Sequence, residues 1–182
     1  PKHGGAALQV SAMFKNALKN ISNLEDEGQI RKYINDLLDG KAYDGSGLVY
    51  GMGHAIYTLS DPRATLLKEK AREVAEIKGG HFIEKFEFLS RFERIASEEL
   101  SKRLNRNYAL AANVDFYSGF VYEMLGFPKE LYTPLFATAR MAGWCAHRLE
   151  QITDNKIIRP GYVTLGEKHP YVLMKNRTKS ID

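Results

Sequence analysis

The stretch VSAMFKNALKNI, residues 10–21, places an apolar side chain at every third or fourth position. Its apolar residues follow the spacing i, i+3, i+4, i+7, i+8, i+11 and are Val10, Met13, Phe14, Ala17, Leu18 and Ile21. This spacing aligns them in one stripe along a helix, so the stretch predicts an amphipathic α-helix with one buried face. The same period recurs along most of the chain, and we therefore predict an all-α fold.

The ends of the other helices are marked by residues that start or stop a helix. Gly40 ends the second apolar pattern, which runs over about 30–38. Asp61-Pro62 is a typical helix start, because Asp caps a helix and Pro is tolerated in its first turn. A glycine-rich loop is expected over 41–53. We expect further helices over about 30–38, 62–78, 83–104, 116–125 and 129–153.

Composition and charge exclude several classes of protein. The chain has 182 residues, of which 44% are hydrophobic and 26% charged, so it is globular rather than disordered or collagen-like. A net charge of +4 does not mark a nucleic-acid binder and suits an anionic small substrate equally well. The single cysteine, Cys145, excludes a disulfide within the chain and fits a reducing compartment. No run approaches the ~20 apolar residues that span a bilayer, so no membrane partner is expected.

Two histidines stand beside glycines. His3 precedes two glycines at the start of the first predicted helix, where the helix dipole keeps an imidazole neutral and able to donate a hydrogen bond. The alternative is a plain capping turn. His54 follows the glycines of 51–53, where the backbone can approach a ligand closely, and Arg63 can converge with it on a carboxylate or ketone. The alternative there is a glycine-rich turn before a capped helix.

Asp115 stands among aromatic residues at a predicted helix start. Burial there would raise its pKa and suit a catalytic base, whereas the commonest use of such an aspartate is N-capping. Phe136 and Arg140 share one helix face, and Arg159 follows nineteen residues later. Arginines buried there need an anionic partner, and a structural salt bridge is the alternative for either. Together these side chains favour a site for a multiply anionic substrate.

Four blocks of the sequence resemble citrate synthase, in the order and at about the spacing of that family. They are PKHGGA at 1–6, GMGHA at 51–55 with DPR at 61–63, NVDFYSG at 113–119, and AR at 139–140 with IRP at 158–160. The resemblance is to the C-terminal half of the family. It implies a citrate synthase-like fold, with the small domain over about 1–110 and the C-terminal part of the large domain over about 111–182.

The resemblance further implies an acyltransferase of the tricarboxylic acid cycle. Such an enzyme condenses acetyl-CoA with oxaloacetate to citrate and CoA, with no metal and no cofactor. Asp115 matches the base that removes the methyl proton, His3 the histidine on the thioester oxygen, and His54 the histidine on the ketone. The matches to oxaloacetate-binding residues are His54, Arg63, Phe136, Arg140 and Arg159, and the matches to CoA-binding residues are Leu48, Val49, Tyr50, Gly51, Gly53 and Asn113.

Departures from the family leave the acyl specificity open. Tyr57 and Thr58 stand where the family often has a basic side chain near the CoA phosphates. The alternative enzyme is 2-methylcitrate synthase, which uses propionyl-CoA, because one methylene is worth only about 1–3 kcal/mol of discrimination. A non-catalytic citrate synthase-like module is the alternative without activity.

The resemblance also implies a homodimer, in which Arg159 crosses the interface to the site of the partner. The chain begins at Pro1 rather than methionine and matches only part of the family, so we expect a fragment that is inactive by itself. The expected compartment is the cytoplasm, with the mitochondrial matrix as the alternative.

Overall fold

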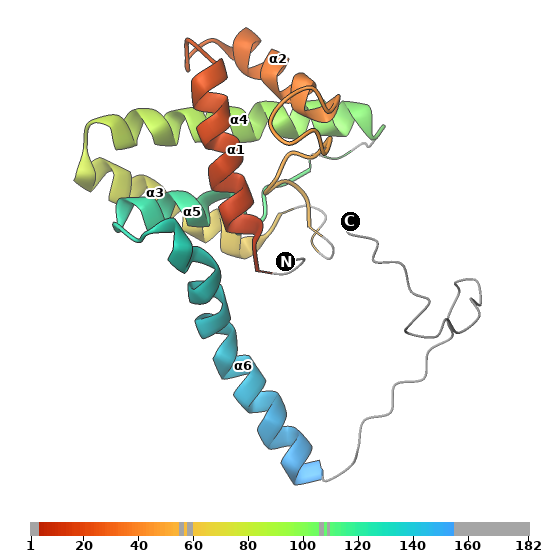
Figure 1. Cartoon of the computed structure of the whole chain (residues 1–182), viewed down its shortest axis with the longest axis vertical. Coiled ribbons are helices and arrows are strands. Elements are labelled where there is room, and N and C mark those ends of the chain that lie inside the picture. The colour runs from red at the N-terminus through yellow and green to blue at the C-terminus, as the bar shows by residue number, and fades with distance from the viewer. Residues whose placement is uncertain (1–3, 55–56, 58–59, 106–107, 109, 155–182) are drawn as a thin grey trace, which may run out of the picture. The chain divides into compact units, whose positions relative to one another are not determined.

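The computed structural model of the chain describes residues 4–54, 57, 60–105, 108 and 110–154. Its elements are α1 (Ala6–Asn20), α2 (Glu27–Leu38), α3 (Pro62–Lys78), α4 (His81–Arg103), α5 (Asp115–Met124), the 3₁₀ turn η1 (Lys129–Leu131) and α6 (Tyr132–Asp154) (Figure 1). Within these residues the only β-type pairing is an isolated antiparallel bridge between Met52 and Ala112. The predicted all-α fold is confirmed.

The predicted helices are all found, with their ends shifted by up to four residues. Asp61 caps α3 as predicted, because its carboxylate accepts the backbone N–H of Arg63 at 3.0 Å. The last helix differs from the prediction. Residues 129–131 form a 3₁₀ turn, and α6 begins only at Tyr132. Pro134 therefore lies in the first turn of α6, where its missing N–H has no helical partner to lose.

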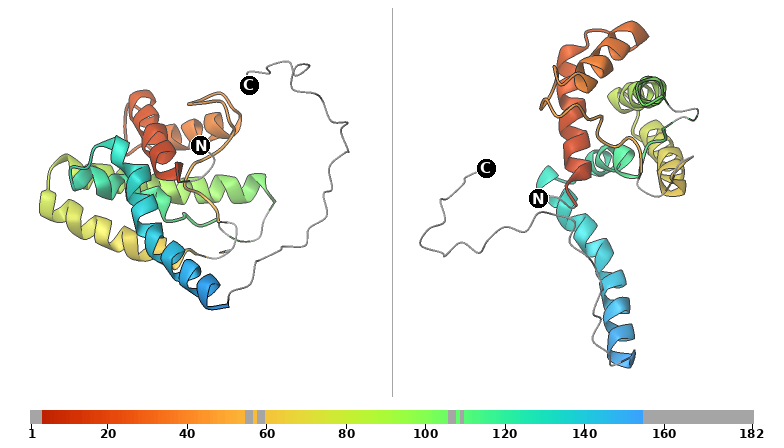
Figure 2. Two further views of the ribbon diagram at one scale, coloured as in Figure 1. Left: turned by 60° about the horizontal axis from the view of Figure 1, so that its bottom comes forward. Right: turned by 90° about the vertical axis from the view of Figure 1, so that its right-hand side faces the viewer.

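The described residues up to Ala142 form one compact unit, and those from Gly143 to Asp154 belong to a second. In the first unit α2 packs against α4, α3 packs against both α4 and α5, and α5 packs against α1. Helix α1 crosses α4 in the view of Figure 1, and Figure 2 shows the same helices from two further sides. The predicted domain boundary near residue 110 concerns a longer subunit and stays a prediction.

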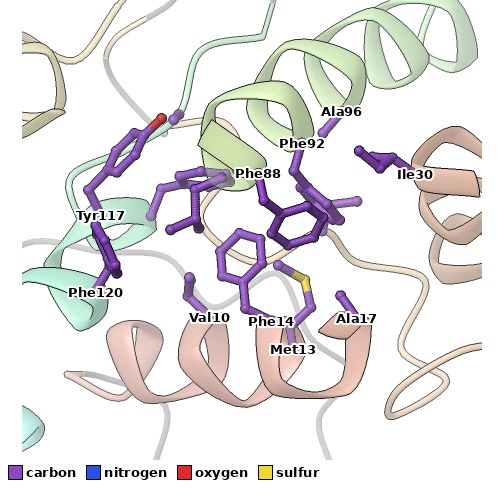
Figure 3. Packing of buried hydrophobic residues seen from close by; sticks show 14 of the residues in the cluster. Val10, Met13, Phe14, Ala17, Ile30, Phe88, Phe92, Ala96, Tyr117 and Phe120 are labelled. Atoms are coloured by element: carbon purple, nitrogen blue, oxygen red, sulfur yellow. The ribbon is translucent and has the colours of Figure 1, made fainter. Parts of the chain in front are cut away.

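The core of the first unit is built around aromatic rings (Figure 3). Phe14 of α1 meets Phe88 and Phe92 of α4 and Phe116 of α5 at centroid distances of 6.2, 5.1 and 5.2 Å. All three contacts are edge-to-face, an arrangement that the ring quadrupoles favour. None of the four rings is more than 5% exposed. The apolar stripe that predicted α1 is thus its buried face, and it faces α4 and α5.

Helix α5 lies close against α1 at Gly119. A Cβ atom placed on Gly119 would overlap the side-chain oxygen of Ser11 and would lie 3.1 Å from the carbonyl oxygen of Ala7. The oxygen of Ser11 can rotate away, whereas the backbone of Ala7 is held in α1. The absence of a side chain at Gly119 therefore sets how closely the two helices pack.

We expect Gly119→Ala to destabilise the fold by about 1–3 kcal/mol, because the added methyl overpacks the α1–α5 contact. Adding Ser11→Ala should recover part of this loss, because it removes the oxygen that the methyl meets first. Urea unfolding of both variants, with Ser11→Ala alone as the control, measures the effect. Wild-type stability in Gly119→Ala would show that the two helices separate at no cost.

Candidate active site

Two segments 60 residues apart pair side by side and bring candidate catalytic residues together. The N–H of Gly53 donates to the carbonyl of Ala111 at 2.8 Å, and the N–H of Asn113 donates to the carbonyl of Gly51 at 2.8 Å. The side-chain amide of Asn113 adds a third bond, to the carbonyl of Gly53 at 2.9 Å. His54 directly follows one paired segment, and Asp115 starts two residues after the other. The pairing therefore ties the loop that leads to His54 to the start of α5, where Asp115 lies.

The glycine at position 51 is required by packing. Its φ is +86°, and a Cβ there would lie 3.0 Å from the Cα of Phe116 and from the Cγ2 of Val10. The sequence predicted a close approach of the backbone in this loop, with a ligand as the partner. The close approach that the structure shows is to α5 and α1. The alternative interpretation, a glycine-rich turn, thus explains the glycine at position 51. A role of the Gly51 backbone in binding CoA stays a prediction.

The carboxylate of Asp61 is the most connected group of the site, although it is buried and only 1% exposed. It accepts Arg63 Nε at 3.0 Å and Nη2 at 2.9 Å, a two-pronged ion pair. It also accepts the N–H of Val114, at the start of α5, at 3.2 Å. Bonding to the Arg63 guanidinium is the main cause that lowers the pKa of Asp61. One carboxylate therefore ties the first turn of α3 to the first turn of α5.

The sequence pattern at Asp61 indicated only a helix cap, and the second role of this carboxylate was not predicted. A usable signal was present, because a cap and a residue two positions later lie in the same turn. An arginine at that position can reach back to the capping carboxylate. The bond to Val114 carried no such signal, since it depends on how α3 and α5 pack.

Asp115 begins α5 without capping it. Val114 occupies the N-cap position, and its own side chain makes no capping bond. The N–H of Asp115 donates instead to the side-chain oxygen of Asn113 at 3.0 Å. The capping alternative for Asp115 is therefore wrong. Burial raises the pKa of Asp115, the nearby Arg63 opposes that shift, and the charge of Asp61 adds to it. A half-buried carboxylate with a raised pKa is suited to accept a proton.

His54 faces Arg63 across a short gap. Its Nδ1 accepts the backbone N–H of Tyr57 at 3.2 Å. Its Nε2 lies 3.3 Å from Nη2 of Arg63, within hydrogen-bond distance, and the imidazole tautomer decides which of the two donates. The structure thus brings together the two side chains that were predicted to converge on a carboxylate or ketone, and their binding of such a group stays a prediction.

Phe136 and Arg140 of α6 lie together beside the start of α1. The guanidinium of Arg140 stacks over the Phe136 ring at 5.7 Å, and Cδ1 of Phe136 lies 3.4 Å from where a Cβ on Gly4 would stand. Phe136 thus neighbours the residue that follows His3. Arg140 is exposed, so the expectation of a buried arginine is wrong. Among the described residues, Arg140 makes no hydrogen bond or ion pair with His54, Arg63 or Asp115.

The remaining predicted site residues are only partly placed. His3 and Arg159 lie outside the described residues. Of the stretch predicted to bind CoA, Leu48 is exposed, Val49 is in the core, and Tyr50 donates its hydroxyl to Asp44 at 2.7 Å. Over the described ranges, acidic, histidine and cysteine side chains form no group of three that could hold a metal ion. In the same ranges the helices are too polar or too short to cross a bilayer.

A family model described as citrate synthase, C-terminal domain, matches residues 1–161. The citrate synthase of Synechocystis sp. is 37% identical over 182 residues, which cover 100% of this chain and 41% of the relative. The citrate synthase of Acidithiobacillus ferridurans is 38% identical over 179 residues, which cover 98% and 42%. The chain therefore spans about two fifths of the length of these curated relatives.

The fold is similar to that of solved citrate synthase structures. The citrate synthase of Thermoplasma acidophilum, in a ternary complex with carboxymethyl coenzyme A and oxaloacetate, superposes with a TM-score of 0.65 and 30% identity. The match covers 97% of this chain and 43% of that one.

The raised pKa of Asp115 makes a prediction about stability. Its folded-state pKa lies above the unfolded value, so its favourable contribution is complete below about pH 3.9 and is lost as pH rises through the folded pKa. We therefore expect Asp115→Asn to be at least as stable as the wild type at pH 7. This advantage should shrink as the pH falls toward about 4, where both side chains are neutral. Urea unfolding at several pH values measures it.

Asp61→Asn is the matched control, and it should change the stability at pH 7 in the opposite direction. The pKa of Asp61 is lowered, so its contribution is present above the unfolded value and is lost as pH falls through the folded pKa. This variant should be less stable than the wild type at pH 7. Loss of stability in Asp115→Asn at pH 7, with recovery at pH 4, would contradict the assignment of a raised pKa.

Proposed function

The chain belongs to the citrate synthase family. We propose that it forms the part of a longer citrate synthase subunit that closes over the substrates. The proposed reaction condenses acetyl-CoA with oxaloacetate to citrate and CoA. The observation that carries the proposal is the convergence of three groups: a carboxylate whose pKa is raised, Asp115, near Arg63, which in turn lies at hydrogen-bond distance from His54. A relative that binds oxaloacetate and a CoA analogue supports the choice of substrates.

The first proposed step is removal of a methyl proton from acetyl-CoA. The proton passes to the carboxylate of Asp115, and the electrons of the C–H bond move to the thioester oxygen. A thioester α-proton is a very weak acid, so burial of Asp115 helps but does not suffice. A neutral donor on the thioester oxygen lowers the barrier further, and His3 is the residue proposed for this part.

The second proposed step joins the two substrates. An imidazole N–H of His54 donates to the ketone oxygen of oxaloacetate, which draws electrons from the carbon that the enolate attacks. A carbon–carbon bond forms, and the ketone oxygen takes up a proton. Arg63 and Arg140, with Arg159, are proposed to hold the substrate carboxylates, with Phe136 packed against the substrate. Water then cleaves the thioester, so the proposed reaction needs neither a metal nor a further cofactor.

A direct assay tests the proposal. A full-length subunit that contains this chain is incubated with oxaloacetate and either acetyl-CoA or propionyl-CoA, and thiol release is followed. Turnover with acetyl-CoA supports citrate synthase, a preference for propionyl-CoA supports 2-methylcitrate synthase, and no turnover with either supports a binding module. The 182-residue chain alone should be inactive, because it spans about two fifths of the curated relatives.

The proposed compartment is the cytoplasm. Its support is the single cysteine, Cys145, which is exposed and unpaired in the structure and therefore suits a reducing compartment. Fractionation of cells that express the full-length subunit tests this, and recovery with an oxidising compartment would overturn it.

We expect Asp115→Asn to lower kcat by roughly 10²–10⁴-fold, because asparagine keeps the shape of the side chain but cannot accept the proton. Oxaloacetate affinity should change little, since the arginines and His54 hold that substrate. Exchange of the methyl protons of acetyl-CoA should fall together with kcat. A variant that retains near-normal kcat would remove Asp115 from the role of base.

The proposed homodimer places Arg159 in the active site of the partner. Full-length Arg159→Ala and Asp115→Asn subunits should each be inactive as homodimers. Mixed heterodimers should regain part of the activity, because one of their two sites then has both residues intact. Heterodimers that form but stay inactive would place Arg159 in its own subunit's site.

A further inference from the structure

Asn113 joins the two paired segments of the candidate site through each of its polar groups. Its backbone N–H donates to the carbonyl of Gly51 at 2.8 Å, and its backbone carbonyl accepts the N–H of Phe116 at 3.1 Å. Its side-chain nitrogen donates to the carbonyl of Gly53 at 2.9 Å, and its side-chain oxygen accepts the N–H of Asp115 at 3.0 Å. One residue thus holds the glycine loop over 51–53 and the start of α5.

The side chain makes both of its bonds because it is a carboxamide. The carbonyl of Gly53 can only accept a hydrogen bond and the N–H of Asp115 can only donate one, so these partners fix which end of the amide is nitrogen. A carboxylate of the same shape would offer no donor to Gly53. A serine hydroxyl is shorter and would reach only the N–H two residues further on. Both bonds at once therefore need an amide of this length.

The backbone of Asp115 is held from outside its own helix at two successive N–H groups. The N–H of Asp115 bonds to Asn113, and the preceding N–H, of Val114, bonds to the buried carboxylate of Asp61 at 3.2 Å. The first N–H groups of a helix have no partner within the helix, and helix ends fray. These two bonds therefore keep the first turn of α5 formed, and they fix the direction in which the Asp115 side chain leaves the backbone.

The other bond of the Asn113 side chain fixes the end of the loop. The carbonyl of Gly53 belongs to the peptide group that joins this residue to His54. Glycine lets such a group turn easily, and Gly53 has a φ of +79°. The bond from Asn113 holds this peptide plane, and with it the direction in which the chain continues to His54.

We propose that Asn113 is a positioning residue that sets Asp115 and His54 at a fixed separation. The oxygen end of its side chain holds the start of α5, and the nitrogen end holds the peptide that leads to His54. This inference rests on the proposed function for the role of Asp115 as the base and of His54 at the ketone. It gives the Asn113 side chain a place within the protein, in contrast to the contact with CoA that the resemblance implies.

Two variants of the full-length subunit separate the two ends of the side chain. Asn113→Ala removes both bonds, whereas Asn113→Ser leaves a hydroxyl that can accept the N–H of Asp115 and removes only the bond to Gly53. We expect each variant to lower kcat by about 10–100-fold, because a displacement of about 1 Å between reacting groups can cost about that much. The KM for acetyl-CoA should change little, since the link acts on the reacting groups.

Asn23→Ala is the matched control. Asn23 makes the same kind of bond, from its side-chain oxygen to the N–H of Glu25 at 2.9 Å, in the connection between α1 and α2. This variant should keep the wild-type kcat. Wild-type kcat in Asn113→Ser would overturn the proposal, because the bond at the start of α5 would then suffice. A raised KM for acetyl-CoA with an unchanged kcat would also overturn it, and would assign Asn113 to CoA.

Amide hydrogen exchange tests the same proposal without any activity. Peptides over 51–54 and 111–117 of the full-length subunit are followed by mass spectrometry. Asn113→Ser should speed exchange in both peptides by about three- to tenfold, because one hydrogen bond between the segments is lost, and Asn23→Ala should leave both unchanged. Unchanged exchange over 51–54 in Asn113→Ser would overturn the proposal. An inactive wild type with the expected exchange would reject the proposed function and leave Asn113 as the link between the two segments.

Discussion

The buried carboxylate of Asp61 constrains the rest of the site, because it serves two helices at once. It caps α3 and holds Arg63, and it accepts the N–H of Val114 at the start of α5. A buried charge that lost these partners would keep the cost of its desolvation, so none of the bonds can be given up alone. The first turns of the two helices must therefore stay together, and Arg63 and Asp115 stay together with them.

Close backbone approach provides the second constraint. Gly119 lets α5 lie against α1, and Gly51 lets the loop pack against the start of α5. Side chains at these positions would move α5, and Asp115 would move with it. A glycine such as Gly51, which suggests a ligand-binding loop in the sequence, is thus also required by helix packing. Packing and binding are compatible explanations, because a loop held this firmly presents His54 from a fixed position.

The helices could be predicted from the sequence because their signals are local. A period of 3.6 residues and a cap such as Asp61 depend only on neighbours in the chain. The start of α6 was missed, because Pro134 is tolerated in a first turn and so does not mark a single starting position. The site could not be predicted in the same way, because it depends on contacts between distant segments, such as the bond from Asn113 to Gly53. Resemblance to a family supplied those residues together, whereas their individual patterns left structural alternatives open.

Under the proposed function, the charge balance around Asp115 would link the two substrates physically. Burial raises its pKa, and the positive charge of Arg63 works against that shift. A carboxylate of oxaloacetate bound to Arg63 would offset this positive charge and bring a negative charge close to Asp115. Both changes favour the protonated form of Asp115, which makes the carboxylate a stronger base. The site would then be best able to take a proton from acetyl-CoA once oxaloacetate is in place, as a condensation of the two requires.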